Sequence, residues 1–197
     1  MNSKHPQPFS YQQSNGSCWI TSVHNGLLHL LGTSDRIEHF ISRYLYILTS
    51  AEGTYSEEAR ILVKLINENR RLRVQARIIQ CETIDEERLR RFLGRRKSVL
   101  ITDTLSGTHS ILLLSMEKNK IIAFDPDWDN VKDCKVKRGC YVCCPFETVN
   151  SRMMLNPYFN ARIHIDHFLK ARTLEDKDQR FVMGANSERF IIELIKK

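Results

Sequence analysis

No run of about 18 consecutive apolar residues, the length that a helix needs to cross a bilayer, occurs in this chain of 197 residues. The first residues, MNSKHPQPFSYQQ, have no apolar core between a basic start and a small-residue cleavage site, so they do not predict a secretory signal. No internal repeat, low-complexity segment or linker is visible. We therefore expect one domain over residues 1–197, with no membrane span and enough length to bury a core.

Six cysteines occur in this chain, which lacks the pattern of a secretory signal. Cytosolic proteins keep their thiols reduced, so we expect free cysteines rather than a disulfide framework. The expected location is the cytoplasm, and the size suits a bacterial protein. Export as an effector without a standard signal is the alternative.

The formal net charge is +7, and much of the positive charge falls in two clusters. These are Arg70, Arg71, Arg73 and Arg77, followed by Arg88, Arg90, Arg91, Arg95, Arg96 and Lys97. Basic patches attract nucleic acid or anionic membrane surfaces. Phe92 is the single aromatic residue among these arginines and no nucleic-acid module is recognised, so we expect solvated surface and no nucleic-acid partner.

The first part of the chain has the periodicity of amphipathic helices. Three long helices are expected over residues 18–31, 35–49 and 57–69. Gly32 is expected to end the first of them. Residues 72–80 alternate as a strand does, and Thr83 with Glu86 predicts a capping box for a short helix that ends near Phe92.

The middle of the chain changes to short aliphatic runs separated by turn residues. Strands are expected over residues 98–102, 109–115 and 120–124. Near the C-terminus, RFVMGANSERFIIELI is interpreted as two strands around Ala185-Asn186-Ser187, with a final helix as the alternative. Helices first and sheet afterwards predict an α+β domain, with a helical N-terminal half packed on an antiparallel sheet.

A cysteine directly follows Asn-Gly-Ser at the start of the first expected helix, within YQQSNGSCWITSVHNGLLHLLG. A thiol has an unperturbed pKa of about 8.5, and the positive potential of a helix N-terminus favours the thiolate. Gly16 would let a substrate approach the backbone closely. The N–H of Cys18 and a side-chain amide from Gln12 or Gln13 would suit an oxyanion. A buried structural cysteine is the other interpretation.

The proton acceptor for Cys18 has to come from another part of the fold. His24 faces away from Cys18, because six positions rotate about 240° around an α-helix, and His29 lies about three turns further on. His109 opens the most apolar strand of the chain and is the candidate base. A strand-end histidine that keeps one nitrogen in water is the simpler interpretation.

The expected hairpin supplies a carboxylate for His109. A tight turn in MEKNK, residues 116–120, places the window from about 125 to 129, DPDWD, opposite His109. Asp125 directly ends the strand and is the expected partner, with Asp127 in reserve. A carboxylate there fixes the tautomer of the imidazole and stabilises its charged form. A plain turn is the simpler interpretation of Asp-Pro.

Gly16-Ser17-Cys18-Trp19 resembles the nucleophile signature of papain-like cysteine peptidases, although Asn15 stands where papain itself carries a cysteine. The distance from Cys18 to His109 is shorter than the papain spacing of about 130 to 150 residues. The chain looks more like the compact peptidase C39-like branch of the same superfamily. In that branch a Gln precedes the cysteine where Gln12 stands, the histidine begins a hydrophobic strand, and an Asp-Pro pair ends the next strand.

The resemblance covers roughly residues 8–130 and implies a papain-like fold with a thiol mechanism. It implies a cysteine peptidase or amide hydrolase that cleaves, or transfers, an acyl group of a peptide or protein substrate. The catalytic residues are then Cys18, His109, Asp125 and Gln12, and the substrate-binding candidates are Gly16, Trp19 and Trp128. No cofactor is expected.

Two further groups resemble metal ligands. In KDCKVKRGCYVCC, Cys140 and Cys143 have the spacing of one zinc-ligand pair, but no second pair accompanies them. In a strand, Cys140 and Cys144 would also face away from Cys143. His164 and His167 lack a third, distant ligand. We therefore expect no metal.

Two rival functions remain, an inactive papain-like binding module and a basic adaptor that contacts anionic partners. The substrate and the oligomeric state stay open.

Overall fold

A computed structural model describes residues 9–10, 18–32, 35–49, 55–80, 84–95, 97–104, 109–127, 141–143, 146–149, 152–155, 158–169, 181–183 and 190–197. The helices in these segments are α1 (Cys18–Leu31), α2 (Asp35–Thr49), α3 (Tyr55–Glu68), α4 (Glu86–Leu93) and α6 (Ile165–Phe168). None of them is long and apolar enough to span a membrane.

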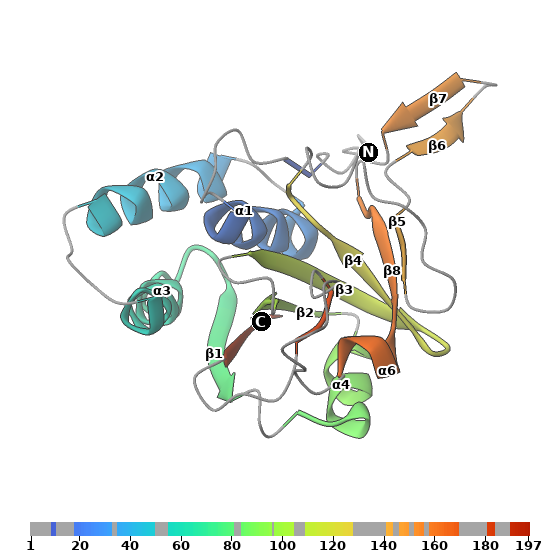
Figure 1. The fold of residues 1–197 in the computed structure, drawn as a ribbon. Helices are drawn as coiled ribbons and strands as arrows, with labels where there is room; N and C mark the ends of the chain where they lie inside the picture. The colour runs from blue at the N-terminus through green and yellow to red at the C-terminus, as the bar shows by residue number, and fades with distance from the viewer. Residues whose placement is uncertain are drawn as a thin grey trace.

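Seven of the described strands form one sheet, in the order β1-β9-β2-β3-β4-β8-β5 (Figure 1). Their bounds are β1 (Val74–Gln80), β2 (Ser98–Asp103), β3 (Ser110–Glu117), β4 (Lys120–Phe124), β5 (Tyr141–Cys143), β8 (Ala161–His164) and β9 (Phe190–Lys196). Every pairing in this sheet is antiparallel. A separate hairpin consists of β6 (Phe146–Val149) and β7 (Arg152–Leu155). The α+β prediction is confirmed.

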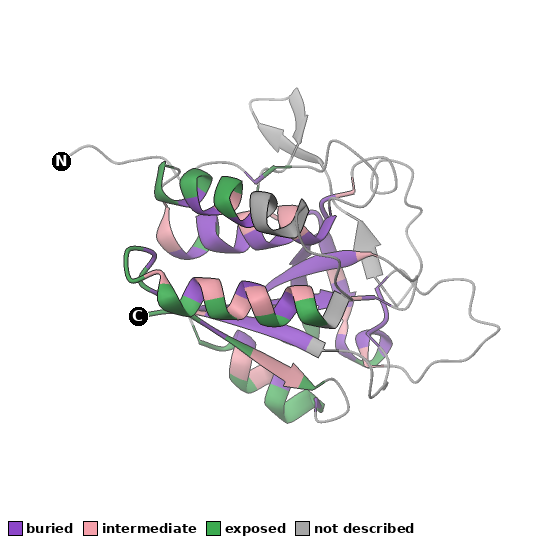
Figure 2. Ribbon diagram, turned by 90° about the vertical axis from the view of Figure 1, so that its left-hand side faces the viewer, coloured by how far each residue is buried: buried purple, intermediate pink, exposed green. Residues whose placement is uncertain are grey.

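The central strands are buried on both faces, which is why they read as continuous apolar runs. One face packs against α1, α2 and α3, and the other packs against α4, α6 and residues 181–183 (Figure 1). The central strands are accordingly coloured as buried in Figure 2, while exposed residues lie on the helix faces that are directed away from the sheet. The sheet is thus covered on a second face that the sequence interpretation did not include.

Helix α1 lies directly on the sheet because Gly26 leaves room for it. A Cβ built at Gly26 would lie 3.2 Å from Leu194 Cδ1 and 3.3 Å from Leu112 Cδ1. The helix ends as predicted at Gly32, which has a φ of +64° and whose N–H donates to the carbonyl of Leu28 at 2.8 Å. The close packing fixes the height of α1 above β3 and β9.

Local signals predicted most elements to within two residues, and α4 shows one error. The N-cap of α4 is Asp85, whose side chain accepts the N–H of Arg88 at 2.7 Å. The predicted start at a Thr83–Glu86 capping box is therefore wrong, and Thr83 itself lies outside the described residues. Asp and Thr are both good caps, so composition alone does not choose between them.

The interpretation of the C-terminal segment is half confirmed. Residues of FIIELI lie in β9, so the helical alternative is wrong. However, Phe181, Val182 and Met183 are buried without forming a strand, and the N–H of Met183 donates to the carbonyl of Phe168 at 2.8 Å. Instead of pairing with this segment, β9 lies between β1 and β2.

Candidate active site

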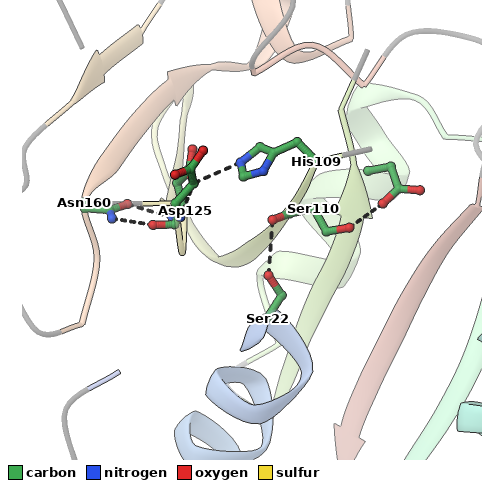
Figure 3. Close-up of polar contacts among 7 residues, drawn as sticks. Ser22, His109, Ser110, Asp125 and Asn160 are labelled. Carbon is green, nitrogen blue, oxygen red and sulfur yellow. Dashed lines mark hydrogen bonds and ion pairs between the residues drawn. The ribbon is translucent and has the colours of Figure 1, made fainter. Parts of the chain in front are cut away.

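Three side chains from distant parts of the chain meet where β3 begins and β4 ends. Cys18 is the first residue of α1, His109 directly precedes β3, and Asp125 directly follows β4. The Nε2 atom of His109 lies 2.9 Å from Oδ1 of Asp125 (Figure 3). The side chain of Cys18 makes a hydrogen bond with the same imidazole. The hairpin argument predicted this carboxylate, and the structure adds the thiol.

The contact with Asp125 fixes the roles of the two imidazole nitrogens. An ionised carboxylate only accepts hydrogen bonds, so Nε2 of His109 donates to Asp125. The other nitrogen, Nδ1, is left for the sulfur of Cys18. Asp127, the reserve partner, contributes its backbone N–H instead, which donates to the same Oδ1 of Asp125 at 2.9 Å.

The surroundings hold His109 in its charged form. Burial lowers the pKa of His109, because it removes the imidazolium from water. Hydrogen bonds with Asp125 and Cys18, together with their negative charges, raise the pKa by more, to about 10. An imidazole with this pKa is a cation at neutral pH. The His109 side chain is 15% exposed and that of Asp125 is fully buried.

Ser22 orients the face of α1 that carries Cys18. The two residues are four positions apart and therefore lie on the same face of the helix. The Ser22 hydroxyl donates to the backbone carbonyl of Ser110 at 3.3 Å, and Ser110 follows His109 directly (Figure 3). This contact joins the first turns of α1 to the beginning of β3, so the thiol and the imidazole are held on the same side of the sheet.

The end of the β2–β3 pair is fixed independently. The N–H of Thr104 donates to the carbonyl of His109 at 2.9 Å. The Ser110 hydroxyl donates to Oδ1 of Asp103 at 2.5 Å. The backbone of His109 is therefore held from β2, while its side chain is held by Asp125.

Asn160 holds the backbone of Asp125 from both sides, and the sequence interpretation missed it. Its Oδ1 accepts the N–H of Asp125 and its Nδ2 donates to the carbonyl of Asp125, both at 2.7 Å (Figure 3). Asn160 is fully buried, and its own N–H donates to the carbonyl of Ala123 at 3.1 Å. The sequence signal is weak, since it consists of one polar residue directly before β8.

Asn25 makes the same two-sided contact with Ser10. Its Oδ1 accepts the N–H of Ser10 and its Nδ2 donates to the carbonyl of Ser10, both at 2.8 Å. Next to it, Phe9 packs edge-on against Phe124, with ring centroids 5.1 Å apart. The described N-terminal residues 9–10 are thereby fixed against α1 and β4. Like Asn160, Asn25 was not predicted from the sequence.

The remaining predicted site residues divide into two groups. Gln12, Gly16 and Trp128 lie outside the described residues. Trp19 lies in the core between α1 and α2, is 6% exposed, and donates its indole N–H to the hydroxyl of Tyr44 at 3.4 Å. This placement leaves Trp19 little surface to offer a substrate.

The two groups that resemble metal ligands have different outcomes. Cys143 ends β5, whereas Cys140 and Cys144 lie outside the described residues. His164 is the N-cap of α6, and its Nδ1 accepts the N–H of Asp166 at 3.3 Å, which accounts locally for its position. Within the described ranges, no group of three His, Cys, Asp or Glu side chains is arranged to hold a metal ion.

Comparisons of the chain with models of protein families, with curated proteins and with solved structures found no match. What Cys18, His109 and Asp125 can do chemically is therefore argued from their geometry. A thiol beside an imidazole that a carboxylate orients is the arrangement of nucleophilic catalysis.

Proposed function

We propose that the chain is a cysteine peptidase or amide hydrolase, formed as one papain-like domain over residues 1–197. The observation that supports this most is the hydrogen-bonded series Cys18–His109–Asp125, assembled from α1 and the two ends of the β3–β4 hairpin. A structural cysteine needs neither an imidazole partner nor a carboxylate behind it. A peptide or protein substrate and a bacterial, cytoplasmic location stay predictions.

Before the first step, Nδ1 of His109 holds the proton of the Cys18 thiol, so the reacting pair is a thiolate and an imidazolium. The thiolate attacks the carbonyl carbon of an amide, a C–S bond forms, and the carbonyl oxygen becomes an oxyanion. The backbone N–H of Cys18 belongs to the first turn of α1, where the positive end of the helix dipole favours negative charge. It can donate to that oxyanion together with the proposed donor Gln12, and each donor contributes about 3 kcal/mol.

In the second step, the imidazolium of His109 gives its proton to the leaving amine as the C–N bond breaks. The acyl group is then bound to Cys18 as a thioester. Water, deprotonated by His109, releases it as an acid in hydrolysis, and an amine releases it as a new amide in acyl transfer. Asp125 stabilises the imidazolium and keeps the ring in one orientation throughout.

One observation favours the inactive binding module as a second candidate. Cys18 is only 4% exposed, and a substrate carbonyl has to reach its sulfur. The side chain of His109 is the more accessible member of the pair, at 15% exposed.

Exposure to a peptide library, read by mass spectrometry, separates the two candidates. The peptidase predicts defined cleavage products with the wild-type chain and none with Cys18→Ala. Addition of methylamine distinguishes transfer from hydrolysis, because transfer yields methylamide products. Peptides that are bound but never cleaved by the wild-type chain would favour the binding module.

A further inference from the structure

A hollow lies between α2, the end of α3 and the turn that follows α3. Its volume is about 500 Å³. This is within the range of pockets that hold small ligands, about 300 to 1,000 Å³. The proposed catalytic residues do not line it, so it requires a separate explanation.

The rim of this pocket is strongly basic. Arg43 comes from α2, and Arg70 and Arg71 come from the turn after α3. All three residues are exposed, so their guanidinium groups can reach a ligand from solvent. The lining also includes Glu68, whose carboxylate lies 4.0 Å from Nζ of Lys64, and His39.

The turn that carries two of the arginines is held by backbone contacts. The N–H of Arg71 donates to Oδ1 of Asn69 at 3.1 Å. The carbonyl of Arg71 accepts a hydrogen bond from Nη1 of Arg36 on α2 at 3.4 Å. The turn is therefore fixed to α2 before any ligand arrives, which lowers the ordering cost of binding.

The floor of the pocket is apolar. The rings of Phe40 and Tyr44 are stacked, with centroids 6.4 Å apart and an interplanar angle of 2°. Leu65 from α3 completes this surface. Burial raises the pKa of Tyr44 to about 12, so its hydroxyl stays neutral at physiological pH. No negative charge on the floor opposes an anion.

We propose that this pocket binds an organic anion, whose phosphate or carboxylate group pairs with Arg43, Arg70 and Arg71 while its apolar body rests on Leu65, the half-buried apolar residue of the lining. Guanidinium groups make paired hydrogen bonds with both kinds of anionic group. Cations are disfavoured, because three arginines outnumber the single acidic residue of the lining. The pocket does not depend on the proposed peptidase activity and can be tested in Cys18→Ala.

The test is a titration of the ¹⁵N-labelled full chain with phenyl phosphate, followed by NMR. Tyr44 lines the pocket and accepts the indole N–H of Trp19, so the indole signal of Trp19 reports on occupancy. The chain has two tryptophans, and Trp128→Phe assigns the two indole signals. We expect a saturable shift of the Trp19 signal with a dissociation constant in the millimolar range or tighter.

Matched variants and ligands complete the test. The double variant Arg43→Ala with Arg70→Ala should weaken binding at least about tenfold, because each arginine supplies a charge-assisted hydrogen bond. Arg60→Ala with Arg91→Ala removes the same net charge from exposed positions outside the pocket and should leave binding unchanged. Phenol has the apolar ring without the anionic group, and inorganic phosphate has the anionic group without the ring. Each should bind at least about tenfold more weakly than phenyl phosphate.

Absence of a saturable shift, or equal weakening by both double variants, would overturn the proposal. Equal affinity for inorganic phosphate and phenyl phosphate would also overturn it, because the apolar floor would then contribute nothing. The dispersion of the amide spectrum checks that each variant is folded.

Discussion

Nε2 of His109 and Oδ1 of Asp125 lie 2.9 Å apart at the two outer ends of a single hairpin. The turn at its other end pairs Glu117 with Lys120, and a bulge shifts the register between Leu113 and Ser115. The same bulged register pairs Leu112 with Phe124, which directly precedes Asp125. Formation of one local hairpin therefore also brings the imidazole and its carboxylate together.

Replacement of Asp125 with Asn should lower the pKa of His109. Asp125 raises this pKa through a hydrogen bond and through its charge, whereas burial acts in the opposite direction and remains in the variant. NMR titration of the imidazole should give a pKa that falls from about 10 toward its ordinary value of 6.5. Asp127→Asn is the matched control, because the hydrogen bond from Asp127 to Asp125 uses the backbone N–H of Asp127, which the substitution retains. A fall of equal size in both variants would contradict the assignment.

The stability of the protein should depend on pH through His109. Folding raises the pKa of this group from 6.5 to about 10, so the folded state retains a proton that the unfolded chain releases between these values. The resulting stability is complete below about pH 6.5 and is lost as the pH rises through about 10. Urea unfolding of the wild-type chain and of His109→Gln measures it. The wild-type chain should exceed His109→Gln in free energy of unfolding by an amount that shrinks as the pH rises. A constant or growing difference would refute the proposed coupling between folding and protonation of His109.

Replacement of Asn160 with Ala should affect both stability and the site. It removes two hydrogen bonds of 2.7 Å and leaves the N–H and carbonyl of Asp125 without their buried partners. We expect a loss of about 2 to 4 kcal/mol in the free energy of unfolding, together with a lower pKa of His109.

Asn25→Ala is the matched control for this change. It removes the equivalent pair of bonds to Ser10, so a comparable loss of stability is expected, but the pKa of His109 should stay near its wild-type value. If the two variants left the pKa equally unchanged, Asn160 would have only a general structural role.

A buried charge in β9 gives a prediction about stability alone. Glu193 is fully buried, and its Oε2 pairs with Nε of Arg77, while its Oε1 lies 3.9 Å from Nη1 of Arg95. Arg77→Met would leave this carboxylate with its weaker partner only, and we expect a loss of about 2 to 4 kcal/mol because the half-exposed guanidinium is partly screened. Arg95→Met should cost clearly less. If thermal or urea unfolding showed equal losses of stability in Arg77→Met and Arg95→Met, the closer contact of Glu193 with Arg77 would not be the more stabilising one.

Features encoded by neighbouring residues were predictable from the sequence. The start of α1 at Cys18, its end at Gly32 and the hairpin that joins His109 to Asp125 depend on periodicity and turn signals within short segments. The side-chain contact followed because the turn between Glu117 and Lys120 brings the end of β4 back beside the beginning of β3.

Contacts between distant segments were not predictable in this way. The position of β9 between β1 and β2 and the clamp of Asn160 on Asp125 require knowledge of which strands pair. The apolar pattern of FIIELI is compatible with several strand neighbours, and a single buried asparagine has no periodic signature. The second layer of α4, α6 and residues 181–183 was missed for the same reason.

In the proposed mechanism His109 keeps Cys18 as a thiolate in an ion pair, and the pH dependence of Cys18 alkylation is the sharpest check on this pairing. Iodoacetamide labelling of the folded chain, quantified at Cys18 by mass spectrometry, should proceed at a nearly constant rate from about pH 6 to pH 8, since the thiolate is the reacting form. His109→Gln should restore the ordinary rise of about tenfold per pH unit. The slope is compared rather than the rate, because burial of the sulfur slows the reaction at every pH. An ordinary slope in the wild-type chain, unchanged in His109→Gln, would contradict the account.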